Sequence, residues 1–416
     1  MPRLSVRTQL ALLTGTMASY LYRKTSRAGA GTVLGRTALA LAPNALRELT
    51  GPLHVVLVSG TNGKTTTTRL IAAILAGEGG AVSNATGANM PAGIVNALAG
   101  RGRTARYSVL EVDERYLPGL RDETRADTVV LLNLSRDQLD RSPETFLIAK
   151  RWREALGRAP RTTVVANCND AQVCWAASAA RHVVWVAVEG RWERDSRWCP
   201  ACRGLLDHPP GGAWRCDGCG LERPAPDWAL VGDRLVSGRT DEATAIGLAL
   251  PGRINVSNAA MALATAASLG VAPAAGSVRL RDVRSVAGRY EIVDVAGRRV
   301  RLLLAKNPAS WAETFCVVRG AAAVLLVLNA RQLDGRDTSW IWDVDFAALR
   351  GSAVFVAGER HLDLAVRLDL NGIAFTVVSS LREACAAAPP GLLEVVANYT
   401  GFLDLVRAIR EEAVGA

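Results

Sequence analysis

The stretch from Val55 to Ile74, VVLVSGTNGKTTTTRLIAAI, restricts the fold of this chain more than any other feature. The apolar run from His54 to Ser59 predicts a strand, and the last part predicts a helix from Thr65 to near Gly77. A tight, glycine-rich turn joins the two. The backbone N–H groups of such a turn and the start of the helix favour an anion, and Lys64 adds a positive charge. The sequence therefore predicts a phosphate-binding loop.

The candidate nucleotide-binding residues are those of the turn and of the first helical turn: Gly60, Thr61, Asn62, Gly63, Lys64, Thr65 and Thr66. The hydroxyl of Thr65 is expected where a Mg²⁺ bound to the same phosphates would lie. The standard P-loop pattern requires glycine at the position of Val58, so this loop is a variant. The alternative is a chance GKT in an ordinary loop, but the flanking strand and helix favour the phosphate loop.

A second candidate magnesium ligand lies near the end of the strand predicted from Tyr107 to Val112. Glu111 interrupts an otherwise apolar run there. The carboxyl ends of neighbouring parallel strands meet at one edge of a sheet, so Glu111 is expected opposite Thr65 across a bound Mg²⁺. The alternative is a solvated acid at a strand end.

Four cysteines predict a structural zinc site. They form two CxxC pairs, Cys199 with Cys202 and Cys216 with Cys219, separated by thirteen residues. Each pair can bring two thiolates to one ion, and together they complete a tetrahedral S₄ site. The alternative is a pair of redox dithiols. Free thiols in so long a chain favour a reducing compartment, and we expect the cytoplasm.

The positive net charge of the chain is weak evidence for a nucleic-acid partner. The net charge of +10 would suit nucleic acid, but only four of the 49 basic residues are lysine, and so strong an arginine skew is typical of codon bias. The segment from Gln9 to Leu21 is apolar, flanked by basic residues and too short to span a bilayer. A signal peptide is the alternative; we favour an amphipathic basic helix that packs on the protein or rests at a membrane surface.

The remaining pattern is that of an α/β protein with more than one domain. We expect a basic helix and lead-in at 1–50, a P-loop ATP-binding domain at 51–284 with the zinc ribbon inserted at about 197–222, and a smaller Rossmann-like domain at 285–416. Three turns of the last part should emerge at the carboxyl edge of its sheet, where ligands bind: AKNPASW (305–311), DGRDTSWIWD (334–343) and NYTGF (398–402).

These motifs carry a family resemblance. The compact GTNGKT turn resembles that of the Mur ligase and folylpolyglutamate synthetase superfamily. The set SGTNGKTTT, LEVDE, RDQLDR, the four-cysteine ribbon, AKNPA, DGRDTSWIWD and NYT resembles the MurT family, the Mur-ligase-like subunits of lipid II isoglutaminyl synthase, over nearly the whole chain. The resemblance implies ATP, Mg²⁺ and structural Zn²⁺. It also implies amidation of the D-glutamate α-carboxylate in the lipid II stem peptide, with ammonia from a GatD-type glutaminase partner.

The resemblance also assigns roles to single residues. It places Asn255 and Asn258 near the adenine, with helix capping as the alternative for Asn258. It implies that Asp337 completes a Cys-His pair of the glutaminase, whereas the residues alone allow a simple turn with Asp337 as a cap. Gln138 replaces a histidine that helps to hold a second Mg²⁺ in Mur ligases. Lys150 lies near, but not at, the position of their carbamylated lysine.

Two rival functions remain open at this stage. The chain could ligate a free amino acid, as ordinary Mur ligases do, or it could be a nucleic-acid-dependent ATPase that combines a P-loop with a zinc ribbon. No helicase-like acidic box and no interleaving of aromatic and basic residues supports the second. None of the four histidines lies in a recognisable Cys-His context, so we expect the chain to depend on a partner for ammonia.

Overall fold

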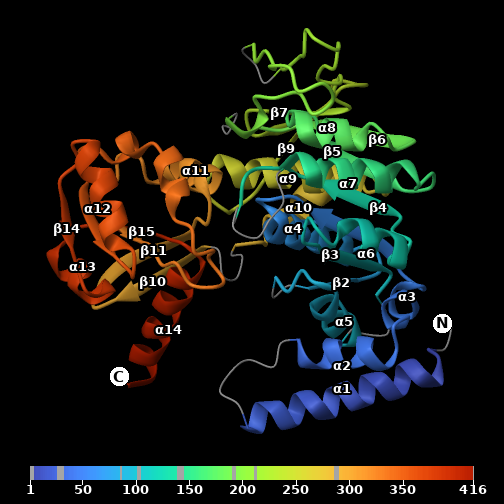
Figure 1. Cartoon of the computed structure of the whole chain (residues 1–416), viewed down its shortest axis with the longest axis horizontal. Coiled ribbons are helices and arrows are strands. Elements are labelled where there is room, and N and C mark those ends of the chain that lie inside the picture. Colours follow the sequence, from blue (N-terminus) through green and yellow to red (C-terminus); the bar gives the residue numbers. More distant parts are fainter. Residues whose placement is uncertain are drawn as a thin grey trace. The chain divides into compact units, whose positions relative to one another are not determined.

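The computed structural model describes residues 4–25, 32–84, 87–100, 105–137, 145–189, 194–209, 213–284 and 290–415 (Figure 1). They form two compact units. Unit 1 comprises residues 1–134, 145–250 and 254–284, and unit 2 comprises residues 135–144, 251–253 and 285–416. Among the described residues, no helix has the length and apolar character needed to cross a membrane.

Unit 1 is built on a nine-stranded sheet of described residues, in the order β2-β3-β1-β4-β5-β6-β7-β8-β9. The strands are β1 (His54–Ser59), β2 (Ala81–Ser83), β3 (Tyr107–Glu111), β4 (Thr128–Leu131), β5 (Thr163–Asn167), β6 (His182–Ala187), β7 (Trp228–Val231), β8 (Arg234–Ser237) and β9 (Ala243–Ala245). Neighbours from β2 to β7 run parallel, and β8 and β9 are antiparallel. The sequence pattern did not predict the short hairpin strands β7 to β9.

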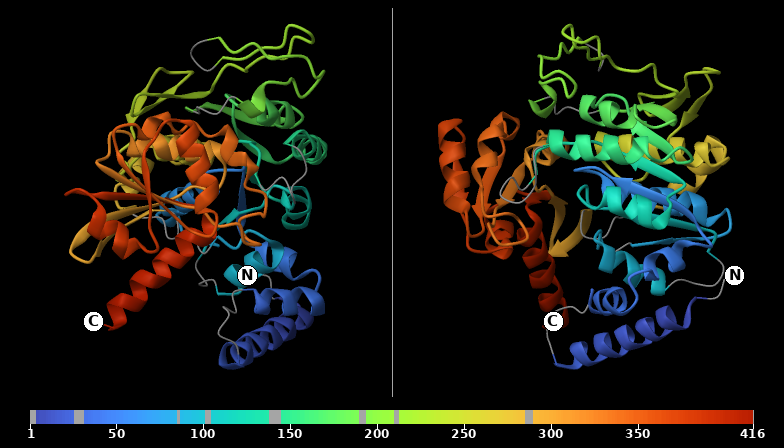
Figure 2. Two further views of the ribbon diagram at one scale, coloured as in Figure 1. Left: turned by 60° about the vertical axis from the view of Figure 1, so that its left-hand side comes forward. Right: turned by 45° about the vertical axis from the view of Figure 1, so that its right-hand side comes forward.

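Helices lie on both faces of this sheet, and α1 forms an outer layer beyond α2 (Figure 2). The helices of the described residues are α1 (Val6–Thr25), α2 (Val33–Leu41), α3 (Ala45–Thr50), α4 (Lys64–Ala76), α5 (Pro91–Ala99), α6 (Leu117–Thr124), α7 (Thr145–Gly157), α8 (Ala171–Ala177), the 3₁₀ turn η1 (Arg194–Ser196), α9 (Arg253–Ser268) and α10 (Pro273–Leu280). Strand β1 has the predicted bounds, and α4 begins one residue before the predicted start. Because β1 lies between β3 and β4 with both faces covered, its side chains read as a continuous apolar run.

Asp170 ties two strand ends of unit 1 together. It caps the N-terminus of α8, where its carboxylate accepts the N–H groups of Gln172 (2.9 Å) and Val173 (3.0 Å). Its other oxygen accepts the N–H of Leu134, beyond β4, at 2.8 Å. Burial raises the pKa of Asp170 to about 6 against these three bonds, so the carboxylate is ionised at neutral pH.

We expect Asp170→Asn to lower the free energy of unfolding by about 1–3 kcal/mol. The amide oxygen can still accept from the helix, but the amide NH₂ then faces the N–H of Leu134, and two buried donors oppose each other. Urea unfolding at neutral pH measures the change. Asp345→Asn is the matched control because Asp345 is an exposed cap with one backbone partner, Ala347. Equal stability of the two variants would contradict the role given to Asp170.

Unit 2 contains a six-stranded sheet of described residues in the order β10-β11-β15-β12-β13-β14. The strands are β10 (Tyr290–Val295), β11 (Arg298–Leu304), β12 (Ala323–Val327), β13 (Ala353–Ala357), β14 (Phe375–Val377) and β15 (Leu393–Ala397). The helices are α11 (Pro308–Val318), η2 (Ser339–Asp343), η3 (Phe346–Leu349), α12 (His361–Leu370), α13 (Leu381–Ala387) and α14 (Tyr399–Gly415). Only β10 is antiparallel to its neighbour, so the other five strands end at one edge.

Candidate active site

The turn after β1 has the backbone geometry of an anion cradle. Gly60 and Gly63 have φ of +145° and +85°, which a side chain makes unfavourable, and α4 begins directly at Lys64. A Cβ on Gly63 would lie 2.4 Å from Oδ1 of Asn258, which projects from α9. The backbone conformation therefore favours glycine at this position, and a larger residue would also displace the side chain of Asn258. The first N–H groups of a helix have no acceptor within the helix, so a phosphate is favoured at the start of α4.

Asn133, just beyond β4, fixes the shape of the turn. Its side-chain oxygen accepts the N–H of Asn62 at 2.9 Å, and its NH₂ group donates to the carbonyl of Asn62 at 3.0 Å. The carbonyl of Asn133 also accepts the N–H of Thr61 at 2.9 Å. Asn133 was not predicted to support the loop, because a bond across two strand ends has no local signature in the sequence.

Lys64 is buried within the turn. Its side chain is 5% exposed, and Nζ donates to the carbonyls of Gly60 (2.5 Å) and Thr61 (3.2 Å). Glu114 forms an ion pair with it at 3.2 Å. A buried ammonium needs such partners, and it stays beside the helix N-terminus where phosphate oxygens would bind. Glu114 belongs to the LEVDE motif, but its pairing with Lys64 was not predicted.

Thr65 and Glu111 meet as the sequence analysis expected. The hydroxyl of Thr65 donates to Oε2 of Glu111 at 2.7 Å, and the carboxylate is buried. Mg²⁺ prefers hard oxygen ligands at about 2.1 Å, which places adjacent ligands about 3 Å apart. The two oxygens therefore fit one magnesium site. Gly87 lies beside both oxygens, since a Cβ built on it would lie 3.9 Å from Oε2 of Glu111 and 4.0 Å from the hydroxyl of Thr65.

Two asparagines that the sequence analysis did not single out hold Glu111 in place. Asn84 accepts the N–H of Glu111 and donates to its carbonyl, both at 2.8 Å. Asn89 donates to the second carboxylate oxygen of Glu111 at 3.3 Å. The Asn-rich composition of this stretch was the available signal, but composition alone does not show which side chain an asparagine supports.

Of the other residues of unit 1 named from the sequence, Asn258 lies beside the phosphate loop. Asn258 is the sixth residue of α9, which excludes the capping alternative, and it contacts Gly63. Asn255 lies in the first turn of the same helix and is partly buried. Lys150 is exposed on α7, and Gln138 lies outside the described residues.

The four predicted zinc ligands form one cluster in unit 1. The sulfur atoms of Cys199, Cys202, Cys216 and Cys219 all lie within 4.8 Å of one another. The Cys199–Cys219 and Cys202–Cys216 separations are 3.6 and 3.4 Å, too long for disulfides. Four sulfurs at about 2.3 Å from a tetrahedral Zn²⁺ lie about 3.8 Å apart, so the thiols fit this ion.

The three predicted turns of unit 2 do converge at the carboxyl edge of its sheet. Trp311 and Trp340 pack edge to face at 5.7 Å and join the first turn to the second. Buried Asp334 accepts both the N–H (2.8 Å) and the hydroxyl (2.5 Å) of Thr400, and so joins the second to the third. Asp334 is thus a structural residue.

Asp337 lies three residues further along and is exposed. One carboxylate oxygen accepts the N–H of Ser339 at 2.8 Å. This bond holds the pKa of Asp337 below its usual value, so the carboxylate is ionised throughout the neutral range. Asp337 therefore caps a local turn, as the alternative interpretation expected, and this turn holds an ionised carboxylate at the surface.

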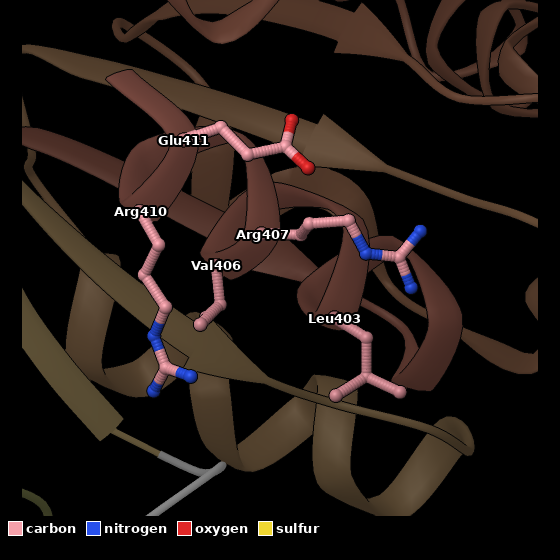
Figure 3. Close-up of a pocket in the computed structure, with 5 residues that line it drawn as sticks. All are labelled: Leu403, Val406, Arg407, Arg410 and Glu411. Carbon is pink, nitrogen blue, oxygen red and sulfur yellow. The ribbon is translucent and has the colours of Figure 1, made fainter. Parts of the chain in front are cut away.

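A separate pocket of 540 Å³ lies along α14 (Figure 3). It is lined by Leu403, Val406, Arg407, Arg410 and Glu411. None of these residues belongs to the phosphate loop or to the converging turns, so we assign the pocket no part in the candidate active site.

Family models and relatives match along most of the chain. The Mur ligase middle domain matches residues 58–191, and the MurT ligase C-terminal domain matches residues 304–402. The lipid II isoglutaminyl synthase (glutamine-hydrolyzing) subunit MurT of Streptococcus pneumoniae is 30% identical, and the match covers 96% of each chain. This chain belongs to the MurT family. The MurT subunit of Staphylococcus aureus is 28% identical, with 95% of this chain and 97% of that protein covered.

Solved structures show the fold that this MurT-family chain shares with peptide ligases. A pseudomurein peptide ligase type C from Methanothermus fervidus matches with a TM-score of 0.63 and 18% identity, covering 91% of this chain and 84% of that chain. A MurF ligase from Thermotoga maritima, solved in complex with ADP, matches with a TM-score of 0.62 and 15% identity, covering 90% and 85%. The Mur-ligase-like α/β fold expected from the sequence is confirmed.

Proposed function

We propose that this chain is the ligase subunit of a lipid II isoglutaminyl synthase. It amidates the D-glutamate α-carboxylate of the lipid II stem peptide, with ATP as energy source and ammonia from a GatD-type glutaminase. The observation that carries the proposal is the match to MurT subunits along almost the whole length of both chains. The loop and the Thr65–Glu111 pair supply the matching chemistry.

Different residues of the site contact the phosphates, the adenine and the Mg²⁺ of bound ATP. The N–H groups at the start of α4 and the ammonium of Lys64 bind phosphate oxygens, and Asn255 contributes near the adenine. The oxygens of Thr65 and Glu111 would hold Mg²⁺. The ion supplies charge neutralisation on the transferring phosphoryl group.

Transfer of the γ-phosphoryl group to the glutamate carboxylate gives an acyl phosphate, and attack by ammonia then forms the amide and releases phosphate. The protein's contribution to such a transfer is positioning and charge stabilisation. Asp337 acts in the partner's site, where its carboxylate orients the imidazole of the Cys-His pair.

Co-expression with a GatD-type glutaminase and an assay on lipid II test this function. We expect the two chains to copurify, and glutamine to drive amidation that depends on ATP and Mg²⁺. Stimulation of ATP hydrolysis by a free amino acid without ammonia would instead support an amino-acid ligase. Salt-sensitive stimulation by oligonucleotides would support the nucleic-acid ATPase.

We propose that the four-cysteine cluster binds one structural Zn²⁺. All four ligand positions are filled by thiols, which leaves none for a water molecule. Cys199 and Cys216 also pack in a small apolar core with Cys168 and Cys174, so the ion would hold the ribbon against the rest of unit 1. We assign it no part in the chemistry.

Metal analysis tests this zinc site. We expect one Zn²⁺ per wild-type chain and at least about a tenfold lower content in Cys199→Ser, with faster proteolysis of the ribbon, because metal binding is coupled to local folding. Cys316→Ser is the control, since Cys316 lies on α11 outside the cluster. Disulfides and no zinc in the wild-type protein would indicate redox dithiols instead.

We also propose the domain division and location expected from the sequence. The Mur ligase middle domain match lies within the ATP-binding domain at 51–284, and the MurT C-terminal match lies within the domain at 285–416. A lipid-linked substrate made from cytoplasmic precursors would place the enzyme at the inner face of the cytoplasmic membrane.

A further inference from the structure

Helix α1 is the outermost layer at one end of unit 1, and α2 lies between it and the rest of that unit (Figures 1 and 2). Its inner face carries small residues: Thr8, Ala11, Gly15 and Ser19, all buried. A Cβ on Gly15 would lie 2.6 Å from the carbonyl oxygen of Leu34 in α2. This face is therefore packed closely against α2 and is unavailable to another partner.

The opposite face of α1 is apolar and exposed. Val6, Leu10, Leu13, Met17 and Tyr20 recur at intervals of four and three residues, which places them in one stripe along the helix. Leu13 and Met17 are 62% and 67% exposed. Large apolar side chains in a continuous exposed row indicate an interaction surface, whereas single ones do not.

The charge of α1 favours an anionic lipid surface over a second copy of this helix as the partner of the stripe. The helix contains Arg7, Arg23 and Lys24 and no aspartate or glutamate. Lys24 lies at the end of the stripe, 4.8 Å from the ring of Tyr20. Two copies of this helix packed together would place like charges near one another without acidic partners. An anionic lipid surface would pair with the basic residues and accept the apolar side chains.

We propose that the exposed stripe of α1 docks the protein on an anionic membrane surface, with the helix lying in the plane of the lipid headgroups. The tyrosine and the basic residues would lie at the level of the headgroups, and the aliphatic side chains below them. The proposal rests on the proposed function in one respect, because docking would bring the enzyme to a substrate that is held in the membrane by its lipid. The binding itself requires no catalytic step.

Flotation with vesicles tests the proposal on the full-length chain. We expect binding to vesicles of equal parts phosphatidylglycerol and phosphatidylcholine, weaker binding at high salt, and little binding to phosphatidylcholine alone. Leu13→Glu with Met17→Glu should reduce binding to the anionic vesicles at least about tenfold, because two charges would enter the apolar stripe.

Leu362→Glu with Val366→Glu is the matched control. These side chains are also exposed and four residues apart, on α12, so the change in net charge is the same. Vesicle binding of this variant should equal that of the wild type. Circular dichroism checks that both variants are folded. If the α1 and α12 variants bind equally, or the wild type does not bind anionic vesicles, the proposal is wrong.

Two further measurements separate this proposal from the function and from self-association. With the glutaminase present, the α1 variant should amidate a water-soluble muropeptide at the wild-type rate and lipid II in vesicles more slowly. If the wild-type complex amidates neither substrate while the wild-type chain still binds the anionic vesicles, the proposed function is rejected and the docking proposal stands. A wild-type dimer that the α1 substitutions convert to monomer, without vesicle binding, would identify a second copy as the occupant and overturn the proposal.

Discussion

Lys64→Ala should reduce ATP-dependent amidation at least about 10²–10³-fold, whether glutamine or ammonia supplies the nitrogen. The ammonium of Lys64 is fixed by two loop carbonyls and by Glu114, so it requires no rearrangement to stabilise charge on the phosphates. Alanine removes this charge and leaves Glu114, whose side chain is 13% exposed, to repel the phosphates. Amidation of lipid II by the complex, followed by mass spectrometry, measures the loss.

Lys150→Ala is the control for Lys64→Ala. Lys150 is an exposed lysine on α7, where its ammonium is solvated, so its removal should leave amidation near the wild-type rate. Copurification with the glutaminase should be unchanged in both variants, because neither change alters unit 2. A Lys64→Ala enzyme within about threefold of the wild-type rate would reject the role given to this residue.

Local pattern predicted the centre of the candidate active site well. The strand, the turn and the helix of residues 54–76 follow one another without interruption, so periodicity and glycine placement suffice to predict them. Glu111 was predicted at a strand end beside the loop, and the pairing of β3 with β1 places it there. The prediction succeeded because parallel strands end at one edge of a sheet.

Two residues that support this site, Asn84 and Asn133, were not predicted, and they act by hydrogen bonds across the fold. Asn258 was predicted near the adenine, but its position beside Gly63 was not. An asparagine that braces a loop resembles, in sequence, one that caps a helix or ends a strand. Only the tertiary structure separates these roles, because the partners are distant along the chain.

In unit 2 the sequence predicted a Rossmann-like domain and the edge at which the turns meet, but not how the turns are joined. Asp334 and Asp337 lie in one short motif and differ completely in burial. Asp334 is buried and binds Thr400, whereas Asp337 is exposed and binds only its neighbouring turn among the bonds of the described residues. The exposed carboxylate is the one available to a partner, and this distinction agrees with the role that the family resemblance assigns.

Asp337→Asn should reduce glutamine-driven amidation by about 10²–10⁴-fold while ammonia-driven amidation stays near the wild-type rate. Asparagine can still accept the N–H of Ser339, so the turn is retained and only the charge is lost. A neutral side chain no longer favours the protonated imidazole that forms during thioester formation. The complex is assayed with glutamine and, separately, with saturating ammonium chloride.

Asp345→Asn is the matched control for this experiment, because Asp345 is also exposed and also accepts the N–H two residues ahead, at 2.9 Å. It should support both nitrogen sources at the wild-type rate. An unchanged glutamine-driven rate in Asp337→Asn would reject the proposed role in the glutaminase. Equal loss with glutamine and ammonia would place Asp337 in the ligase reaction, because only a step shared by both nitrogen sources slows both.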